Sequence, residues 1–320
     1  MRVGIDLGTA NITVAIEKRG VILREPAVMA INKKNSKIMY IGESAREMLG
    51  KTNPEIKAIY PLQNGVIADY QATELLLKHF LNRVCGKIKL AKPSVVMSVP
   101  VKLTSIEERA LKEASISAGA QSTHLIPSPM AIALGADLPV DKPVGTMVID
   151  IGAGSTDIAV ISLGGIVCSS SIKTGGRKMD DSIIRYVRKV YNLIIGQQTA
   201  EDIKIRIGSA IQSDNPMSME VKGRDIIDSI PKSITLSDDE LREPIEESLK
   251  AIKECIKKVF EKTPPELIAD IIDNGIVLAG GGALLKGLEE RFTREMGVHF
   301  YIPDDSLTCV ARGTILAKIQ

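Results

Sequence analysis

Apolar residues recur along the chain either at every second position, which predicts strands, or at every third to fourth position, which predicts helices. The opening stretch MRVGIDLGTANITVAIE reads as a strand, a glycine-containing turn and a second, alternating strand. A buried strand is predicted over 94–99, where four of the six residues are apolar. Apolar residues at helical spacing predict helices over 72–84, 104–119, 180–190 and 243–261.

Capping and breaking residues sharpen some of these boundaries. Thr104 with Glu107 three residues later is typical of a capping box, and Pro264 follows the end of the helix predicted to finish at 261. The section over about 195–240 is rich in Gly, Ser, Asp and Pro and is predicted to be less regular. Beyond it, a strand over 275–279 and a helix over 283–296 flank three consecutive glycines.

One pattern occurs twice, nearly half the chain apart. TMVIDIGAGSTDIAVISLGG repeats the apolar strand, the acidic residue, the glycine turn and the second apolar strand of the opening stretch. The acidic positions are Asp6 and Asp150. We interpret this repeat as an internal duplication of one domain type.

Length and composition set the scale and exclude some partners. A chain of 320 residues, 44% hydrophobic and 25% charged, suits about two domains. The net charge is only +2, aromatic residues make up 3%, and Trp is absent. Neither a basic patch nor a base-stacking platform is indicated, so we expect no nucleic-acid partner.

The cysteine pattern and the hydropathy of the chain indicate the cellular compartment of the protein. The four cysteines are far apart and form no CxxC pair, and there are three histidines, which argues against a disulfide framework and a zinc site. The chain enters its first strand without a signal-like segment, and no apolar run reaches the length of a membrane span. We expect a cytoplasmic protein whose membrane contact is at most peripheral.

The repeated hairpins carry recognisable chemistry. A carboxylate at a strand end holds Mg²⁺, usually through water, and glycines without Cβ let backbone N–H groups approach phosphate oxygens. A single Asp-x-Gly hairpin is more often an ordinary turn. Two at matching places favour a nucleotide clamp. The side chains that add hydroxyl or amide donors are Thr9, Asn11, Ser155 and Thr156.

The three glycines Gly280, Gly281 and Gly282 admit two interpretations. They either let a base or ribose lie against the backbone near a helix N-terminus, or they form a close packing turn between strand and helix. No GxxxxGK[ST] motif is present, which excludes a P-loop enzyme. No GxGxxG opens a helix after the first strand, which disfavours a dinucleotide fold.

With these three elements in this order, the chain resembles the actin-like ATPase superfamily, and more specifically the MreB/Mbl family of bacterial actin homologues. The resemblance covers essentially the whole chain. Segments that carry it include GIDLGTAN, PLQNGVIADY, IDIGAGSTDIAVISLG, TAEDIKIRIG, VKGRDIIDSIPKSI and TPPELIADIIDNGIVLAGGGALLKGLEERF.

The resemblance implies an α/β, actin-like bilobed fold built by duplication of a ribonuclease H-like unit, with two domains of two subdomains each. Domain I is expected over 1–138, with subdomain IB at about 29–65 and the C-terminal 304–320 returning to it. Domain II is expected over 139–303, with subdomain IIB at about 176–241.

The same resemblance implies roles for individual residues, with ATP and Mg²⁺ as cofactors. Asp6 and Asp150 are expected on the metal side. Ser128, Ser155 and Thr156 are expected to serve catalysis. Cofactor binding is expected from Gly8, Thr9, Ala10, Asn11, Gly152, Gly154, Ser155, Thr156, Glu201, Lys204, Gly280, Gly281 and Gly282. Without the resemblance, Glu201 and Lys204 would be read as a surface ion pair on one helix face.

Two positions depart from the family pattern. Ser128 stands where relatives usually carry the acidic residue that helps position the attacking water. A serine is shorter and a weaker base, so we expect slow or absent ATP hydrolysis unless a neighbouring group substitutes. Arg177 stands where an aspartate is usual, and it either adds positive charge near the phosphates or points to solvent.

The resemblance also implies partners. We expect a homopolymer of paired protofilaments at the inner face of the cytoplasmic membrane, with cell-shape or wall-synthesis proteins as further partners. Ile88 and Leu90, among lysines, are the expected membrane-inserting residues, although an edge strand with solvated lysines fits the same pattern. A sugar kinase or a chaperone-type ATPase is the alternative, but neither a sugar-site pattern nor a peptide-binding domain is recognisable.

Overall fold

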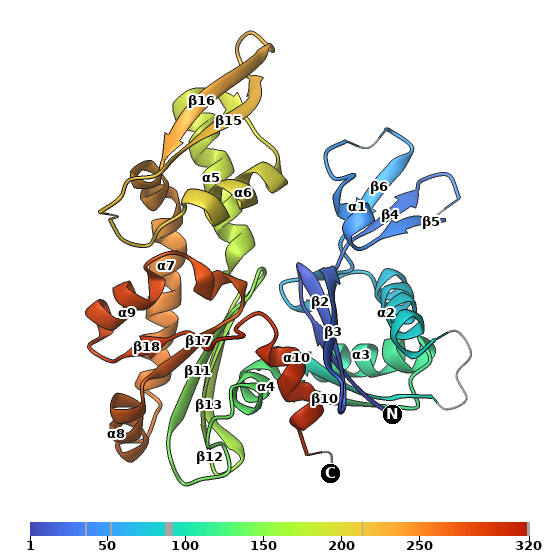
Figure 1. Cartoon of the computed structure of the whole chain (residues 1–320), viewed down its shortest axis with the longest axis vertical. Coiled ribbons are helices and arrows are strands. Elements are labelled where there is room, and N and C mark those ends of the chain that lie inside the picture. Colours follow the sequence, from blue (N-terminus) through green and yellow to red (C-terminus); the bar gives the residue numbers. More distant parts are fainter. Residues whose placement is uncertain (36, 52, 87–91, 213, 319–320) are drawn as a thin grey trace.

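The computed structural model describes residues 1–35, 37–51, 53–86, 92–212 and 214–318. Figure 1 shows two lobes, each with a large sheet at its base and a smaller unit above, separated by a gap that opens between the smaller units. No helix within the described ranges is both long and apolar enough to cross a membrane.

The first large sheet lies in the lobe that contains the N-terminus. Its strand order is β10-β9-β1-β2-β3, with β1, β2 and β3 joined as antiparallel hairpins and β9 and β10 running parallel to β1. The strands are β1 (Arg2–Leu7), β2 (Asn11–Ile16), β3 (Gly20–Pro26), β9 (Ser94–Val99) and β10 (Ser122–Pro127).

The second large sheet repeats this topology, which confirms the duplicated fold. Its order is β13-β12-β11-β17-β18, again with three antiparallel strands and two parallel ones. The strands are β11 (Thr146–Ile151), β12 (Thr156–Ser162), β13 (Gly165–Ile172), β17 (Ile276–Ala279) and β18 (Phe300–Tyr301). The register matches as well, because Asp6 pairs with Thr13 and Asp150 pairs with Asp157.

Each lobe carries a smaller sheet above its large one (Figure 1). In the first lobe it is a three-stranded antiparallel sheet with a short helix, followed by a two-stranded hairpin. Its elements are β4 (Met29–Asn32), β5 (Ile38–Ile41), α1 (Glu43–Arg46), β6 (Ile56–Ile59), β7 (Leu62–Gln63) and β8 (Val66–Ile67). The second lobe's smaller unit has β14 (Leu193–Ile194), α6 (Gln197–Ile207), β15 (Ser218–Asp225) and β16 (Pro231–Ser237).

Helices cover the large sheets and bury an apolar core in each lobe. In the first lobe α2 (Tyr70–Cys85) packs beside α3 (Ser105–Ser117), and Phe80 is fully buried. The capping box predicted at Thr104 and Glu107 is present, with the Thr104 hydroxyl and the Glu107 backbone N–H 3.3 Å apart. The second lobe uses α5 (Gly176–Tyr191), α7 (Asp238–Phe260), α8 (Pro265–Asn274) and α9 (Leu288–Met296).

Two helices join the lobes. α4 (Ser128–Gly135) and α10 (Cys309–Leu316) pack on each other and share a core with apolar residues of both large sheets. Their backbones approach so closely that a Cβ on Gly313 would lie 1.7 Å from the Ala131 carbonyl oxygen. Glycine is therefore required where the two helices cross. α10 also packs on β1, so the last helix completes the first sheet's lobe.

Several predicted elements differ from the structure. The single helix predicted over 283–296 is wrong, because a 3₁₀ turn (Gly281–Leu284) is separated from α9 by Gly287 with φ of +68°. The helix predicted to begin at 243 begins at Asp238, where Ser237 forms a capping box with Glu240. The section predicted as less regular contains α6 and the β15–β16 hairpin.

Candidate functional site

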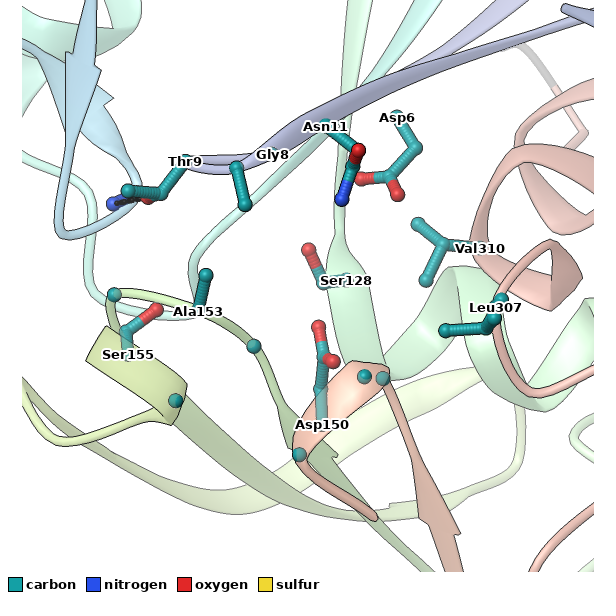
Figure 2. A pocket seen from close by; sticks show the side chains of 18 of the residues that line it. Asp6, Gly8, Thr9, Asn11, Ser128, Asp150, Ala153, Ser155, Leu307 and Val310 are labelled. Carbon is teal, nitrogen blue, oxygen red and sulfur yellow. Dashed lines mark hydrogen bonds between the residues drawn. The ribbon is translucent and has the colours of Figure 1, made fainter. Parts of the chain in front are cut away.

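A cavity of about 490 Å³ lies between the lobes, and residues of both repeated hairpins line it. In Figure 2, Asp6 and Asp150 project into it from opposite sides, and Ser128 is drawn between them. The predicted residues that line it are Asp6, Gly8, Thr9, Ala10, Asn11, Ser128, Asp150, Gly152, Gly154, Ser155, Glu201, Lys204, Gly280, Gly281 and Gly282. Predictions scattered over the chain are thus brought to one place.

The first hairpin places Asp6 at the end of β1 and turns tightly behind it. The Gly8 N–H donates to the Asn11 carbonyl oxygen at 3.0 Å, and a Cβ on Gly8 would lie 2.7 Å from that oxygen. The Asp6 carboxylate accepts a hydrogen bond from the Ser98 hydroxyl at 2.8 Å. Thr9 is also held in place, because its hydroxyl oxygen accepts from the Gly65 N–H at 2.9 Å.

The second hairpin has the same turn and lies against the first. The Gly152 N–H donates to the Ser155 carbonyl oxygen at 2.9 Å, and a Cβ on Gly154 would lie 2.8 Å from the Thr9 hydroxyl oxygen. Thr156 is the one predicted site residue on this hairpin that does not line the cavity. It is fully buried, and its hydroxyl donates to the Thr174 carbonyl oxygen at 2.7 Å.

Burial sets the electrostatics of the cavity. Desolvation raises the pKa of Asp6 to about 6, while the Ser98 hydrogen bond and the charge of Arg24 lower it. The pKa of Asp150 is raised well above its usual value by burial, and the nearby carboxylates of Asp157 and Asp6 raise it further. Buried carboxylates that repel one another favour a cation between them.

The donor set fits Mg²⁺ bound through water and phosphate. Among the described residues, no three His, Cys, Asp or Glu side chains are grouped to hold a metal ion directly. Mg²⁺ commonly binds one or two protein carboxylates and otherwise keeps water and phosphate ligands. Asp6 and Asp150 are oxygen donors of that kind, on opposite sides of the cavity (Figure 2).

A third carboxylate, Asp157, lines the cavity and was missed by the sequence reasoning. It accepts hydrogen bonds from the Val101 N–H at 3.1 Å and from the Ser155 hydroxyl at 3.2 Å. Burial raises its pKa, while these hydrogen bonds and the charge of Lys102 lower it. Its cross-strand register with Asp150 was the signal that could have revealed it.

The glycine loop after β17 lies against the second hairpin. A Cβ on Gly280 would lie 2.5 Å from an Asp150 carboxylate oxygen, and one on Gly282 would lie 2.3 Å from the Ile151 side chain. Close packing therefore requires both of these glycines. At Gly281 the nearest atom would be 3.8 Å away, so there the missing side chain leaves open space beside the cavity.

Glu201 and Lys204 lie one turn apart on α6, and each contacts a different partner. The Lys204 ammonium lies 2.6 Å from the Asp180 carboxylate and donates to the Gly176 carbonyl oxygen at 3.0 Å. Glu201 lies 3.4 Å from the Arg46 guanidinium of the other lobe. Burial raises the pKa of Asp180 to about 6, although Lys204 lowers it.

The two departures from the family pattern occupy well-defined places. Ser128 is the first residue of α4, 9% exposed, and its hydroxyl donates to the Val99 carbonyl oxygen at 3.2 Å. Arg177 reaches across the cleft, where its guanidinium donates to the Thr9 carbonyl oxygen at 2.9 Å and stacks over the Tyr60 ring at 4.5 Å. The predicted membrane residues Ile88 and Leu90 lie outside the described residues.

Comparison with known proteins gives one consistent match. The family model for MreB/Mbl proteins matches residues 1–319. The cell shape-determining protein Mbl of Bacillus subtilis is 44% identical over 312 residues, which cover 98% of this chain and 94% of that protein. The crystal structure of MreB5 of Spiroplasma citri bound to ADP has a TM-score of 0.94 at 39% identity, covering 98% of this chain and 95% of that one.

Two further structures bear on the fold. An AMPPNP-bound structure of MreB5 of Spiroplasma citri matches with the same TM-score, identity and coverage. The MamK double helical filament has a TM-score of 0.81 at 20% identity, covering 99% of this chain and 98% of that one, which is evidence for the fold alone. The actin-like bilobed fold is thereby confirmed.

Proposed function

The chain belongs to the MreB/Mbl family, and on that premise we propose that it is an ATP-binding cytoskeletal protein that polymerises at the membrane and helps determine rod cell shape. The observation that carries the proposal is the convergence of both acidic, glycine-rich hairpins on one cavity between the lobes. The relatives' descriptions agree with it, since Mbl is a cell shape-determining protein and MreB5 binds ADP and AMPPNP.

In this proposal the hairpins grip the phosphates of Mg-ATP. Backbone N–H groups of the two turns face the phosphates, except those of Gly8 and Gly152, which donate within their turns. Asp6 and Asp150 hold Mg²⁺, which screens phosphate charge. Gly280, Gly281 and Gly282 receive the adenosine, with Glu201 and Lys204 beside it. Ser155 lines the same cavity, whereas Thr156 supports the hairpin through its bond to Thr174.

Binding of a fluorescent ATP analogue with and without Mg²⁺ tests the clamp. The Asp150→Asn variant should lower affinity in the presence of Mg²⁺ by at least about tenfold. Asp304→Asn is the matched control, because Asp304 is exposed and outside the cavity lining. Equal affinity of Asp150→Asn and the wild type would reject this site.

We propose that hydrolysis is slow. The Ser128 hydroxyl is engaged with the Val99 carbonyl and cannot act as a base of carboxylate strength. Asp157 is the neighbouring carboxylate in the same cavity, next to Ser155, and we assign any residual water activation to it. ATP binding and ATP turnover are then separable properties of this chain.

Self-assembly is proposed to use the turn between β15 and β16. In Figure 1 this hairpin projects at the far end of its lobe. Ile227 is 73% exposed and Ile230 is 56% exposed, while the Asp225 carboxylate accepts from the Ile227 N–H at 2.7 Å and fixes the turn. Exposed apolar side chains on an ordered turn suit a contact with a second copy of the chain.

Sedimentation with ATP, viewed by electron microscopy, tests assembly. The double variant Ile227→Ser/Ile230→Ser should remain in the supernatant. Leu163→Asn, which also removes an exposed apolar side chain from a turn, should sediment like the wild type. If the double variant forms filaments normally, this turn is not an assembly contact.

Membrane binding at the inner face of the cytoplasmic membrane is proposed through Ile88 and Leu90, next to lysines that meet anionic head groups. Two apolar side chains anchor weakly, so many subunits must bind together. Pelleting with anionic liposomes should be lost in Ile88→Ser/Leu90→Ser, and unchanged pelleting would reject this anchor. The proposed partners in the cell are further subunits and proteins of cell shape and wall synthesis.

A further inference from the structure

Arg177 contacts both phosphate-binding hairpins. Its backbone N–H donates to the Ala153 carbonyl oxygen of the second hairpin at 2.8 Å. Its side chain crosses to the other lobe and donates to the Thr9 carbonyl oxygen of the first hairpin at 2.9 Å. The preceding residue reinforces the attachment, because the Gly176 N–H donates to the Gly152 carbonyl oxygen at 3.0 Å. The N-terminus of α5 is thus fixed to one hairpin while the guanidinium holds the other.

The guanidinium also contacts the upper unit of the first lobe. It lies over the ring of Tyr60, the residue that follows β6, and is 4.5 Å from the ring centroid. A planar guanidinium is suited to this combination, since it stacks on a ring while its N–H groups donate in the plane. A lysine at this position could supply the charge but not the stacked geometry.

Arg177 bridges the two lobes from a position beside the large cavity. Among the described residues, those lining the large cavity do not include Arg177. It lines a second, adjoining cavity of about 80 Å³ together with Tyr60 and Arg46. Of the two alternatives that the sequence left open, these contacts contradict a side chain that points to solvent.

A second set of contacts crosses the same gap between α1 and α6. The Arg46 guanidinium lies 3.4 Å from the Glu201 carboxylate, and the Gln198 side-chain amide donates to the Arg46 carbonyl oxygen at 2.6 Å. The Arg46–Glu201 pair is about one-third exposed on both sides, so water screens it. Of these contacts between the lobes, the one that Arg177 makes lies closest to the hairpins, because it ends on Thr9.

We propose that Arg177 is a positioning residue that latches the two phosphate-binding hairpins together and thereby limits cleft opening and nucleotide release. The part that concerns nucleotide release rests on the proposed function, whereas the part that concerns cleft opening does not. With the latch formed, the Thr9 carbonyl is fixed relative to the second hairpin, so the lobes separate only when this bond and the Tyr60 stack break.

Two measurements on the full chain test the latch. The first is the distance distribution, by pulsed electron paramagnetic resonance, between spin labels at Lys57→Cys and Lys222→Cys, with Cys85 and Cys168 replaced by Ser. Lys57 and Lys222 are exposed residues of β6 and β15, one in each upper unit. The second is the dissociation rate of a fluorescent ATP analogue with Mg²⁺.

Arg177→Ala should lengthen and broaden the distance distribution and raise the dissociation rate about tenfold, as expected for a lost charge-assisted hydrogen bond. Arg177→Lys should give an intermediate result. Arg185→Ala is the matched control, because Arg185 is exposed on the same helix and donates to Ser182 of that helix. It should behave like the wild type in both measurements.

An unchanged distance distribution in folded Arg177→Ala would overturn the latch. If that variant does not fold, Arg177→Gln and Tyr60→Leu decide by the same criterion. Tyr60→Leu keeps the bond to Thr9 and removes only the ring, so a smaller lengthening is expected. If the wild type binds no nucleotide, the proposed function fails, but the distance measurement still decides the latch.

Discussion

Asp150 and Asp157 are cross-strand partners in the β11–β12 hairpin, and both carboxyl groups line the cavity between the lobes. Side chains directly opposite each other in an antiparallel pair lie on the same face. The pKa of Asp150 is accordingly raised by burial and by Asp157. The site thus combines one carboxylate that we propose as a metal ligand with another that is hydrogen-bonded to Ser155.

Replacing Asp157 by Asn should remove the repulsion of Asp150 and most of the residual hydrolysis. We expect affinity for Mg-ATP to be retained or increased and phosphate release to fall by at least about tenfold, a modest loss for a group that activates water. Equilibrium binding and a phosphate-release assay measure the two effects. Unchanged phosphate release would show that Asp157 does not activate the water.

Ser128→Glu should increase phosphate release by at least about tenfold, because it restores a carboxylate at the start of α4, facing the cavity. The matched control is Ser128→Gln, which has the same length without the charge and should stay at the wild-type rate. No gain in the Glu variant, with binding intact, would sink the idea that Ser128 limits turnover.

The raised pKa of Asp6 predicts a specific pH dependence. The folded protein binds this proton more tightly than the unfolded chain does, since the pKa is about 6 instead of 3.8. Its contribution to stability is therefore present below pH 4 and is lost as the pH rises to about 6, by about 3 kcal/mol. Above pH 6 the buried charge of Asp6 persists, and we expect bound Mg²⁺ to compensate it.

Thermal unfolding between pH 5 and pH 8 checks this prediction. The increase in Tm on adding Mg-ATP should grow as the pH rises through 6. Asp6→Asn should be more stable than the wild type at pH 7.5 without nucleotide and should lose the Mg²⁺-dependent part of the increase. A wild-type increase that is independent of pH would contradict the assignment of Asp6.

Gly313→Ala should destabilise the protein by about 3 kcal/mol, because the added Cβ forces α10 away from α4. Gly297→Ala is the comparison, since a Cβ there meets nothing within 4 Å and only the positive φ of 71° opposes it. That change should cost roughly 1 kcal/mol. Urea unfolding of both variants gives the two values, and equal losses would refute the requirement for close approach.

Local patterns predicted the parts of the fold that depend on neighbouring residues. The hairpins that carry Asp6 and Asp150 were predictable because strand, turn and strand are adjacent in the chain. The helix predicted over 283–296 failed at Gly287, where a Cβ would lie 2.3 Å from Ile211. That requirement comes from a distant segment and leaves no trace in periodicity.

The site residues also divide into those that local sequence patterns reveal and those that depend on contacts between distant segments. Asp6, Asp150 and the glycines of the two hairpins were found from the repeated motif, whereas Asp157 was missed. A family resemblance added Glu201, Lys204 and Ser128. The target of Arg177 could not be found that way, because Thr9 and Tyr60 reach it only through the arrangement of two lobes. Thr156 shows the opposite error. Its position in the motif predicted a place in the cavity, but its side chain is buried and donates to the Thr174 carbonyl oxygen.

The packing of α10 against β1 and α4 has a consequence for synthesis on the ribosome. A Cβ on Gly4, in the first strand, would lie 2.0 Å from the hydroxyl oxygen of Thr314, so the earliest and latest segments form one tightly fitted unit. Because α10 follows β1 by about 300 residues in the chain, β1 cannot reach its final packing until α10 has been synthesised. We therefore expect an emerging chain to expose the apolar surface that α10 shares with α4 and the sheets until α10 has been synthesised.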